Sequence, residues 1–322
     1  MSVLVYTENW DGKFKKLSYE LVSYASGVAK MVGGDVTALS IGNVNQDELS
    51  TLGGYGASTV LSVEAGAEGL DNQLHTQLIA AAMEKIGASV LVMANNNTGK
   101  AIAPRLSVRL KAGLASGVTA IPESVNPVVV KKKVFSGKAF AKVKILTEKA
   151  ILTVAQNSYE VVETGGSAAV EAFDAGVDGA VAKTAIKDVQ KQDGKLLLTD
   201  AEVVISGGRG MKSGDNWGPI EELAGVLEAA TACSRPVSDE GWRPHGEHTG
   251  QTGKIIAPNL YFAFGISGAI QHLAGVSSSK CIVAVNTDKD APIFEAADYG
   301  IVGDALKVLP ELITEIKAAR AQ

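Results

Sequence analysis

The sequence has 322 residues, of which 46% are hydrophobic, and its 30 basic and 35 acidic residues give a formal net charge of −5. This length predicts two domains, and the acidic balance argues against nucleic acid as a partner. No apolar run reaches the ~18–20 residues of a membrane helix, and the N-terminus lacks the features of a secretory signal, so we expect a cytoplasmic protein without membrane insertion.

The first half of the chain alternates between strand-like and helix-like segments. Apolar residues recur at helical spacing between Leu17 and Met31, and two glycines then end that helix. Further helices are predicted at 71–86 and 100–111, and strands at 3–7, 36–41, 59–63 and 89–94. Such alternation predicts an α/β domain built on a mostly parallel sheet.

The middle of the chain is rich in β-forming residues. Segments 128–134, 139–146 and 150–156 are separated by short turns and read as antiparallel strands added to the first domain. The polar stretch 184–195 follows. We therefore place a domain boundary near residue 190, which gives domains 1–190 and 191–322.

The second half repeats the alternation with much more glycine. Strands are predicted at 201–206, 260–264, 281–285 and 299–302, with helices at 219–230, up to Leu273 and at the C-terminus. Each strand is followed at once by a distinctive segment, namely 207–210 (GGRG), 265–268 (GISG), Asn286 and 303–304 (GD). The fold class is α/β in both domains, each a mostly parallel sheet with flanking helices.

These strand ends meet at one edge of a parallel sheet, where ligands of open α/β folds bind. Glycine allows close approach of the backbone, and helix N-termini offer N–H groups to anions, so a nucleotide with a pyrophosphate is expected. This argument does not distinguish FAD from NAD or CoA. His245 and His248 have a His-x-x-His spacing, but their neighbours Pro244 and Gly246 favour a loop, so we expect no metal site. Cys233 and Cys281 read as buried, inert thiols.

The second half carries a series of distinctive segments, in the order 206–210 (SGGRG), 233–236 (CSRP), 250–254 (GQTGK), 265–275 (GISGAIQHLAG), 284–286 (AVN), 291–294 (APIF) and 297–300 (ADYG). In these segments and in their order, it closely resembles the C-terminal domain of electron-transfer flavoprotein alpha subunits. The first domain is similar to the family more loosely, best at residues 103–105. The resemblance implies two Rossmann-like domains, the first contacting a beta subunit and the second a glycine-rich FAD-binding domain.

The resemblance also implies the FAD contacts. Arg235 would lie against the isoalloxazine ring, Thr252 would reach its N5/O4 edge, and His272 its O2 side. Arg235 and His272 are the residues expected to tune the flavin potential. Asn286 and Asp304 would bind the adenosine end. The complete set implied is Arg209, Ser234, Arg235, Gly250, Gln251, Thr252, Ser267, Gly268, Ala269, Ile270, Gln271, His272, Asn286 and Asp304.

One departure from the family's pattern lies just before the Gln-Thr-Gly motif, where this chain has residues 246–249 (GEHT). We expect this loop to shape the exposed face of the flavin differently from other members of the family. The difference would affect the flavin potential and the choice of partner more than the identity of the cofactor.

The resemblance implies an electron carrier of a heterodimer, with no catalytic residues of its own. It would accept electrons from flavin dehydrogenases, such as the acyl-CoA dehydrogenases of fatty acid beta-oxidation, and pass them to a membrane quinone oxidoreductase. Three alternatives stay open: an NAD-dependent enzyme on a similar sheet, a nucleotide-binding regulatory module, and a subunit of an electron-bifurcating flavoprotein.

Overall fold

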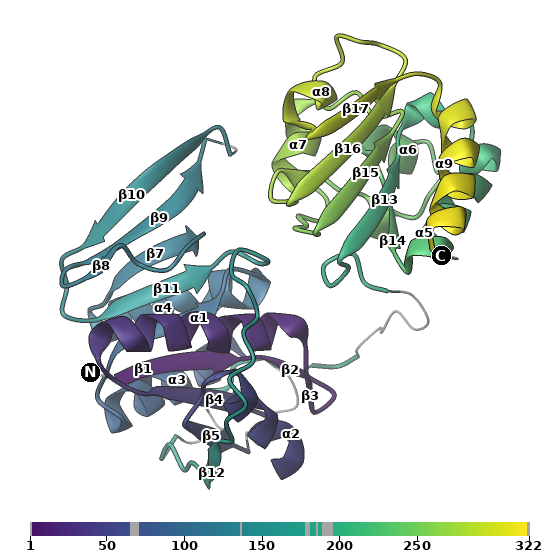
Figure 1. Cartoon of the computed structure of the whole chain (residues 1–322). Helices are drawn as coiled ribbons and strands as arrows, with labels where there is room; N and C mark the ends of the chain where they lie inside the picture. The colour runs from purple at the N-terminus through teal and green to yellow at the C-terminus, as the bar shows by residue number, and fades with distance from the viewer. Residues whose placement is uncertain are drawn as a thin grey trace. The chain divides into compact units, whose positions relative to one another are not determined.

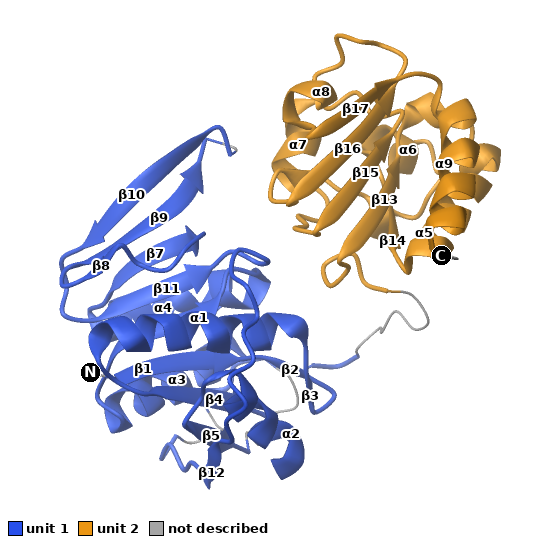
Figure 2. Cartoon of the chain, in the orientation of Figure 1, with its two compact units in different colours: residues 1–189 blue, residues 190–322 orange. Residues whose placement is uncertain are grey.

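The computed structural model describes residues 2–64, 71–135, 137–177, 181–184, 186–188 and 196–320. The chain divides into two compact units, 1–189 and 190–322 (Figure 2). The point at which the boundary was predicted, residue 190, lies outside the described residues. Both units are α/β with parallel-rich sheets and flanking helices, which confirms the predicted fold class.

The described part of the first unit contains one large sheet with the order β10-β9-β7-β11-β6-β1-β4-β5-β12 (Figure 1). Its central strands are parallel: β1 (Ser2–Thr7), β4 (Val36–Ile41), β5 (Thr59–Val63), β6 (Ala88–Ala94), β11 (Ala150–Val154) and β7 (Gly113–Val118). β12 (Ala169–Ala172) pairs in parallel with β5 at one end. β8 (Ser124–Val125), β9 (Val128–Val134) and β10 (Ala139–Ile145) pair in antiparallel fashion at the other end.

This arrangement corrects one expectation. β9 and β10 are antiparallel as predicted, but the segment predicted at 150–156 forms β11, which lies between β6 and β7 and is parallel to both. Every residue of β11 is buried. A nearly continuous apolar run of this kind, interrupted only by Thr153, is typical of a central parallel strand with both faces covered.

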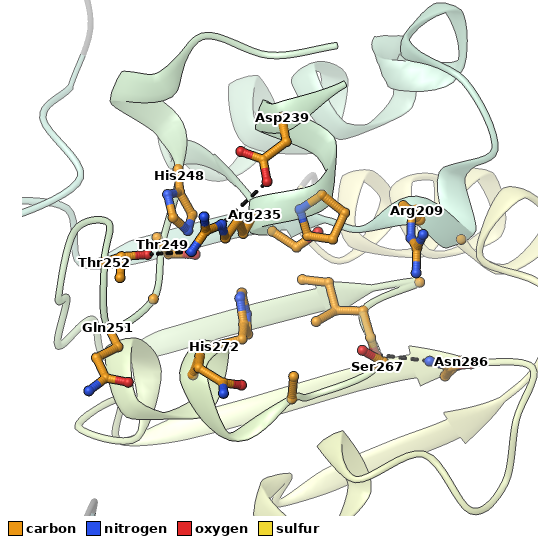
Figure 3. Close-up of a pocket in the computed structure, with 18 residues that line it drawn as sticks. Arg209, Arg235, Asp239, His248, Thr249, Gln251, Thr252, Ser267, His272 and Asn286 are labelled. Carbon is orange, nitrogen blue, oxygen red and sulfur yellow. Dashed lines mark hydrogen bonds and ion pairs between the residues drawn. The ribbon is translucent and has the colours of Figure 1, made fainter. Parts of the chain in front are cut away.

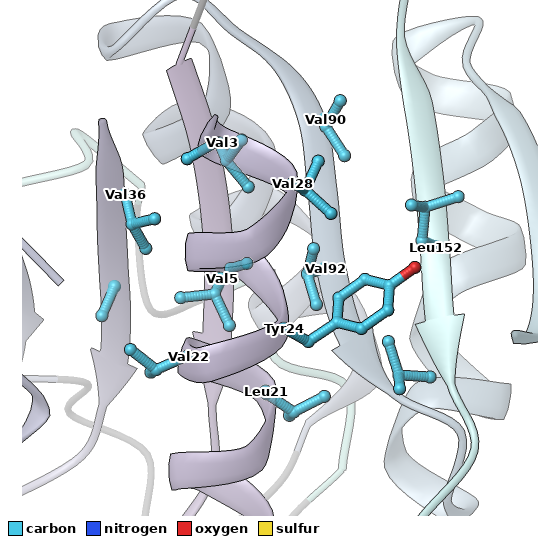
Figure 4. Packing of buried hydrophobic residues seen from close by; sticks show 14 of the residues in the cluster. Val3, Val5, Leu21, Val22, Tyr24, Val28, Val36, Val90, Val92 and Leu152 are labelled. Atoms are coloured by element: carbon cyan, nitrogen blue, oxygen red, sulfur yellow. The ribbon is translucent and has the colours of Figure 1, made fainter. Parts of the chain in front are cut away.

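Helices cover both faces of that sheet. α1 (Lys16–Val32) packs Leu21, Tyr24 and Val28 against Val3 and Val5 of β1 (Figure 4). The alternate residues of β1 point to the opposite face, where α3 (Asn72–Lys85) and α4 (Asn97–Leu110) form a second core. The short elements are β2 (Asn9–Trp10), β3 (Lys13–Phe14), α2 (Gln46–Ser50) and η1 (Thr51–Tyr55).

The second unit has a wholly parallel sheet with the order β14-β13-β15-β16-β17. Its strands are β13 (Val203–Gly207), β14 (Ala230–Cys233), β15 (Leu260–Phe264), β16 (Cys281–Asn286) and β17 (Tyr299–Val302). The helix predicted at 219–230 was too long: α5 (Gly218–Leu227) ends earlier, and β14 begins at Ala230.

Helices also cover both faces of this second sheet. α5 and α9 (Ala305–Arg320) belong to one core, with Val237 of α6 (Arg235–Asp239). α7 (Ile270–Val276) and α8 (Ile293–Ala296) contribute to the other core. The remaining short helices are η3 (Arg209–Met211), η4 (Gly214–Trp217) and η5 (His245–Glu247). Within the described ranges, no helix is both long and apolar enough to cross a membrane.

Candidate functional site

A pocket of about 530 Å³ lies at the carboxyl edge of the second sheet. It is lined by residues that follow β13, β14 and β15 and by the last residue of β16, the positions at which a ligand of an open parallel sheet binds. Eleven of the residues expected from the sequence line it: Arg209, Ser234, Arg235, Gly250, Gln251, Thr252, Ser267, Ala269, Gln271, His272 and Asn286.

Three other expected residues do not line this pocket. Gly268 has φ +82°, and a Cβ placed on it would lie 2.3 Å from the backbone nitrogen of Ile293, so this position requires glycine. Ile270 is exposed. Asp304 is held elsewhere, since its carboxylate pairs with Nζ of Lys212 at 2.9 Å and accepts the backbone N–H of Leu306 at the start of α9. The hydrogen bond from Lys212 is the main cause that lowers the pKa of Asp304.

Glycines bring two strand-end loops into backbone contact under the pocket. Gly265 has φ +62°, and a Cβ there would lie 2.7 Å from Cα of Gly210. A Cβ on Gly208 would lie 2.3 Å from the carbonyl oxygen of Gly265. Because no side chain can occupy this space, the loops after β13 and β15 stay in contact and leave room for a ligand above them.

Arg235 stands at the first position of α6, beside the pocket (Figure 3). Its side chain is 63% exposed and pairs with Asp239 at 3.3 Å. Its Nη1 lies 3.5 Å from Oγ1 of Thr252, which is longer than the ~2.7–3.2 Å of a well-formed hydrogen bond. The guanidinium is therefore held only lightly by the protein and remains available to a ligand.

His272 is 7% exposed and lies across the pocket from Arg235 (Figure 3). Its Nε2 is 2.9 Å from the hydroxyl of Tyr261, and its buried Nδ1 has no hydrogen-bond partner in the described part of the chain. Burial lowers the pKa of His272 to about 4. The imidazole is therefore neutral at neutral pH, and it acts on a ligand through its dipole and hydrogen bonding rather than through a charge.

Sequence reasoning missed several lining residues, among them His248, whose side chain is buried at 3% exposure. Asp239, Thr249 and Ile266 also line the pocket. The available signal for His248 and Thr249 was their position just before the Gln-Thr-Gly motif. They lie in segment 246–249, where the chain departs from the family pattern, and that segment had been interpreted only as a loop.

The rings of His245 and His248 lie 5.4 Å apart. Among the residues with described coordinates, no three His, Cys, Asp or Glu side chains form a group that could hold a metal ion. Cys233 is buried as expected, and burial raises the pKa of its thiol to about 12, whereas Cys281 is only half-buried.

The pocket fits a flavin nucleotide. It combines two guanidinium groups (Arg209 and Arg235) with amide and hydroxyl side chains, which suits a cofactor that carries phosphates, hydroxyls and a polar heterocycle. The glycine contacts below it supply a floor without side chains, and the lining residue His248 has a ring nitrogen, Nδ1, without a hydrogen-bond partner among the described residues. The fold and site thus define a nucleotide-cofactor-binding α/β protein.

Comparison with known proteins identifies the cofactor and the family. Residues 197–277 match the family described as the electron transfer flavoprotein FAD-binding domain, and residues 3–178 match the electron transfer flavoprotein domain. The chain belongs to the electron transfer flavoprotein family and is of the alpha-subunit type, with FAD as its cofactor.

Three relatives illustrate this similarity. The electron transfer flavoprotein subunit alpha of Syntrophomonas wolfei is 37% identical over 97% of this chain and 98% of its own. The subunit of the same name from Bacillus subtilis is 36% identical over 98% and 97%. Protein FixB of Clostridium saccharobutylicum is 33% identical over 98% and 97%.

Proposed function

We propose that this chain is the FAD-carrying subunit of a heterodimeric electron carrier, and that the pocket after β13–β16 holds the flavin. When bound, FAD supplies the ability to accept and release electrons one at a time. The observation that supports this function best is the position of Arg235: a permanent cation lines the pocket and yet is largely exposed. A flavin beside it would be near the surface, where a partner's redox centre can approach.

The residues of the chain would hold and tune the cofactor. The guanidinium of Arg235 would favour the electron-rich state of a flavin by its charge. The hydroxyl of Thr252, close to that guanidinium, would offer a hydrogen bond to the ring edge. Asn286 donates through Nδ2 to the carbonyl oxygen of Ile266 at 2.9 Å, which orients its amide at the far end of the pocket.

The proposed partners follow from the family. A beta subunit would contact the first unit and complete the flavin environment. Flavin dehydrogenases, such as acyl-CoA dehydrogenases, would donate electrons, and an electron-transfer-flavoprotein quinone oxidoreductase would accept them. The protein would carry out no transformation of an organic substrate.

This proposal can be tested by co-expressing the chain with its beta subunit. The flavin content of the purified protein is then measured, and the flavin is titrated reductively with an acyl-CoA dehydrogenase. One FAD per heterodimer, reduced by the dehydrogenase, is the expected result. Two flavins per heterodimer would favour an electron-bifurcating protein instead. A colourless protein that turns over NAD would replace the carrier function with that of an NAD-dependent enzyme.

A further inference from the structure

The loop from His248 to Lys254 closes tightly on itself beside the pocket. The backbone N–H of Lys254 donates to the carbonyl oxygen of His248 at 2.9 Å, and that of Gly250 donates to the carbonyl oxygen of Lys254 at 3.2 Å. Gly253 donates to Gly250 at 3.1 Å, so Thr252 lies within the turn. The loop thereby presents the Thr252 side chain to the pocket.

The imidazole of His248 fills the inside of this loop. A Cβ placed on Gly253 would lie 2.8 Å from Cγ and Nδ1 of that ring, and one placed on Gly250 would lie 3.4 Å from its Nε2. Figure 3 shows His248, Thr252 and Arg235 grouped on one side of the pocket. The position of Thr252 therefore depends on a ring packed between two glycines.

Packing alone does not explain a histidine at this position. Nδ1 is fully buried without a partner, and neither ring nitrogen of His248 makes a hydrogen bond within the described residues. Burying a polar group without a partner is costly. A purely structural filler would be expected to be apolar. Nδ1 is closed off inside the loop, whereas Nε2 has no hydrogen-bond partner among the described residues and is not among their fully buried polar atoms, so Nε2 is the ring nitrogen that a polar ligand could meet.

The charged and titratable groups around the ring are Arg235, Asp239, His245 and His272. Burial, followed by His245 and Arg235, lowers the pKa of His248, against an opposing effect of Asp239. A neutral imidazole has one N–H donor and one acceptor nitrogen, so it can hydrogen-bond a heterocycle without adding charge to the pocket.

We propose that His248 is a second histidine of the FAD site, whose ring supports the Thr252 loop and whose free hydrogen-bonding capacity is met by the bound cofactor. This inference rests on the proposed function of the pocket. It assigns a binding role to a residue in the very segment where this chain departs from the family's pattern.

The test uses the full-length chain with its co-expressed partner subunit. His248→Phe keeps a flat ring and removes both nitrogens, whereas His248→Gln keeps one donor and one acceptor. His245→Phe is the matched control, because His245 is a neighbouring exposed histidine that does not line the pocket. We expect FAD to bind about tenfold more weakly to His248→Phe, which corresponds to ~1.4 kcal/mol. His248→Gln should recover most of the affinity, and His245→Phe should match the parent.

A second measurement does not depend on a variant that folds. In the parent, a ring nitrogen of His248 should change its ¹⁵N chemical shift when FAD is added to the cofactor-free protein. Parent affinity in His248→Phe together with unchanged ¹⁵N signals would overturn the inference and leave the FAD site intact. Failure of the parent itself to bind FAD would instead refute the proposed function.

Discussion

The burial of His272 predicts a pH-dependent loss of stability in the second unit. Its pKa is 6.5 ordinarily and about 4 in the folded protein, because burial disfavours the charged imidazolium. Between these values the unfolded chain binds the proton and the folded chain does not, so stability decreases as the pH falls from about 6.5 to about 4. From pH 7 to pH 4.5, this single group should remove roughly 2.5 kcal/mol of unfolding free energy.

Urea unfolding followed by tryptophan fluorescence can measure this loss. Two of the three tryptophans, Trp217 and Trp242, belong to the second unit, so a Trp10→Phe background reports on that unit alone. A loss of this size lowers the urea midpoint by roughly 1–2 M at the slopes usual for a domain. His272→Gln should remove most of the pH dependence, while the exposed control His245→Gln should keep it.

The comparison is between slopes with pH, since His272→Gln also breaks the hydrogen bond with Tyr261 and shifts stability at every pH. His248 contributes a dependence of the same sign, because its pKa is also lowered, so the variant is not expected to be wholly flat. If the parent and His272→Gln lose equal stability between pH 7 and pH 4.5, the imidazole is not held neutral by burial and the reasoning is wrong.

Three further predictions concern charge and cofactor. Arg235→Ala should lower the potential at which the bound flavin takes its first electron, with Arg235→Lys retaining part of the difference in a reductive titration; an unchanged potential would make Arg235 a structural residue. Arg243→Met removes the bidentate ion pair that Arg243 makes, at 2.8 Å, with the buried carboxylate of Glu247. Urea unfolding should show a loss of ~3–5 kcal/mol of unfolding free energy, and adding Glu247→Leu should largely restore it. Acid precipitation should release the yellow colour as FAD, and colour in the pellet would indicate covalent attachment.

Local patterns in the sequence were sufficient where a segment's partner did not matter. The apolar spacing from Leu17 to Met31 and the glycines after it predicted α1, whose C-cap Gly33 adopts φ 66°. Residues 36–41 and 59–63 were predicted as strands and form β4 and β5. These segments can be recognised in the sequence because burial in the sheet or on one helix face determines their residue types.

Strand pairing could not be predicted in this way. β11 and β9 were both predicted as antiparallel strands of one β-rich region, yet β11 is parallel in the centre and β9 is antiparallel near the edge. Their difference lies in contacts with strands far away in sequence. β7 and β14 were missed because their residues, GLASGV and ATAC, are small and lack an alternating pattern.

The same limit applied to the site. A strand end could be recognised from glycine and polar residues, but which strand ends converge depends on three-dimensional contacts. Asp304 follows its strand as expected, yet Lys212, 92 residues earlier in the chain, binds its carboxylate beside the N-terminus of α9. His248, in contrast, lines the pocket, although its spacing from His245 had been considered only for a metal site and its segment only as a loop.

The structure also redistributes the electrostatic roles within the pocket. The family resemblance implied that Arg235 and His272 would tune the flavin potential, as a fixed cation or a hydrogen-bond donor. Burial keeps His272 neutral above about pH 4, and His248 is shifted in the same direction. The permanent charges among the lining residues are therefore the guanidinium groups of Arg209 and Arg235, against the carboxylate of Asp239. Because arginine does not titrate at working pH, the two guanidinium groups would place a constant positive charge beside a flavin bound in this pocket, and Asp239 would offset part of the charge of Arg235.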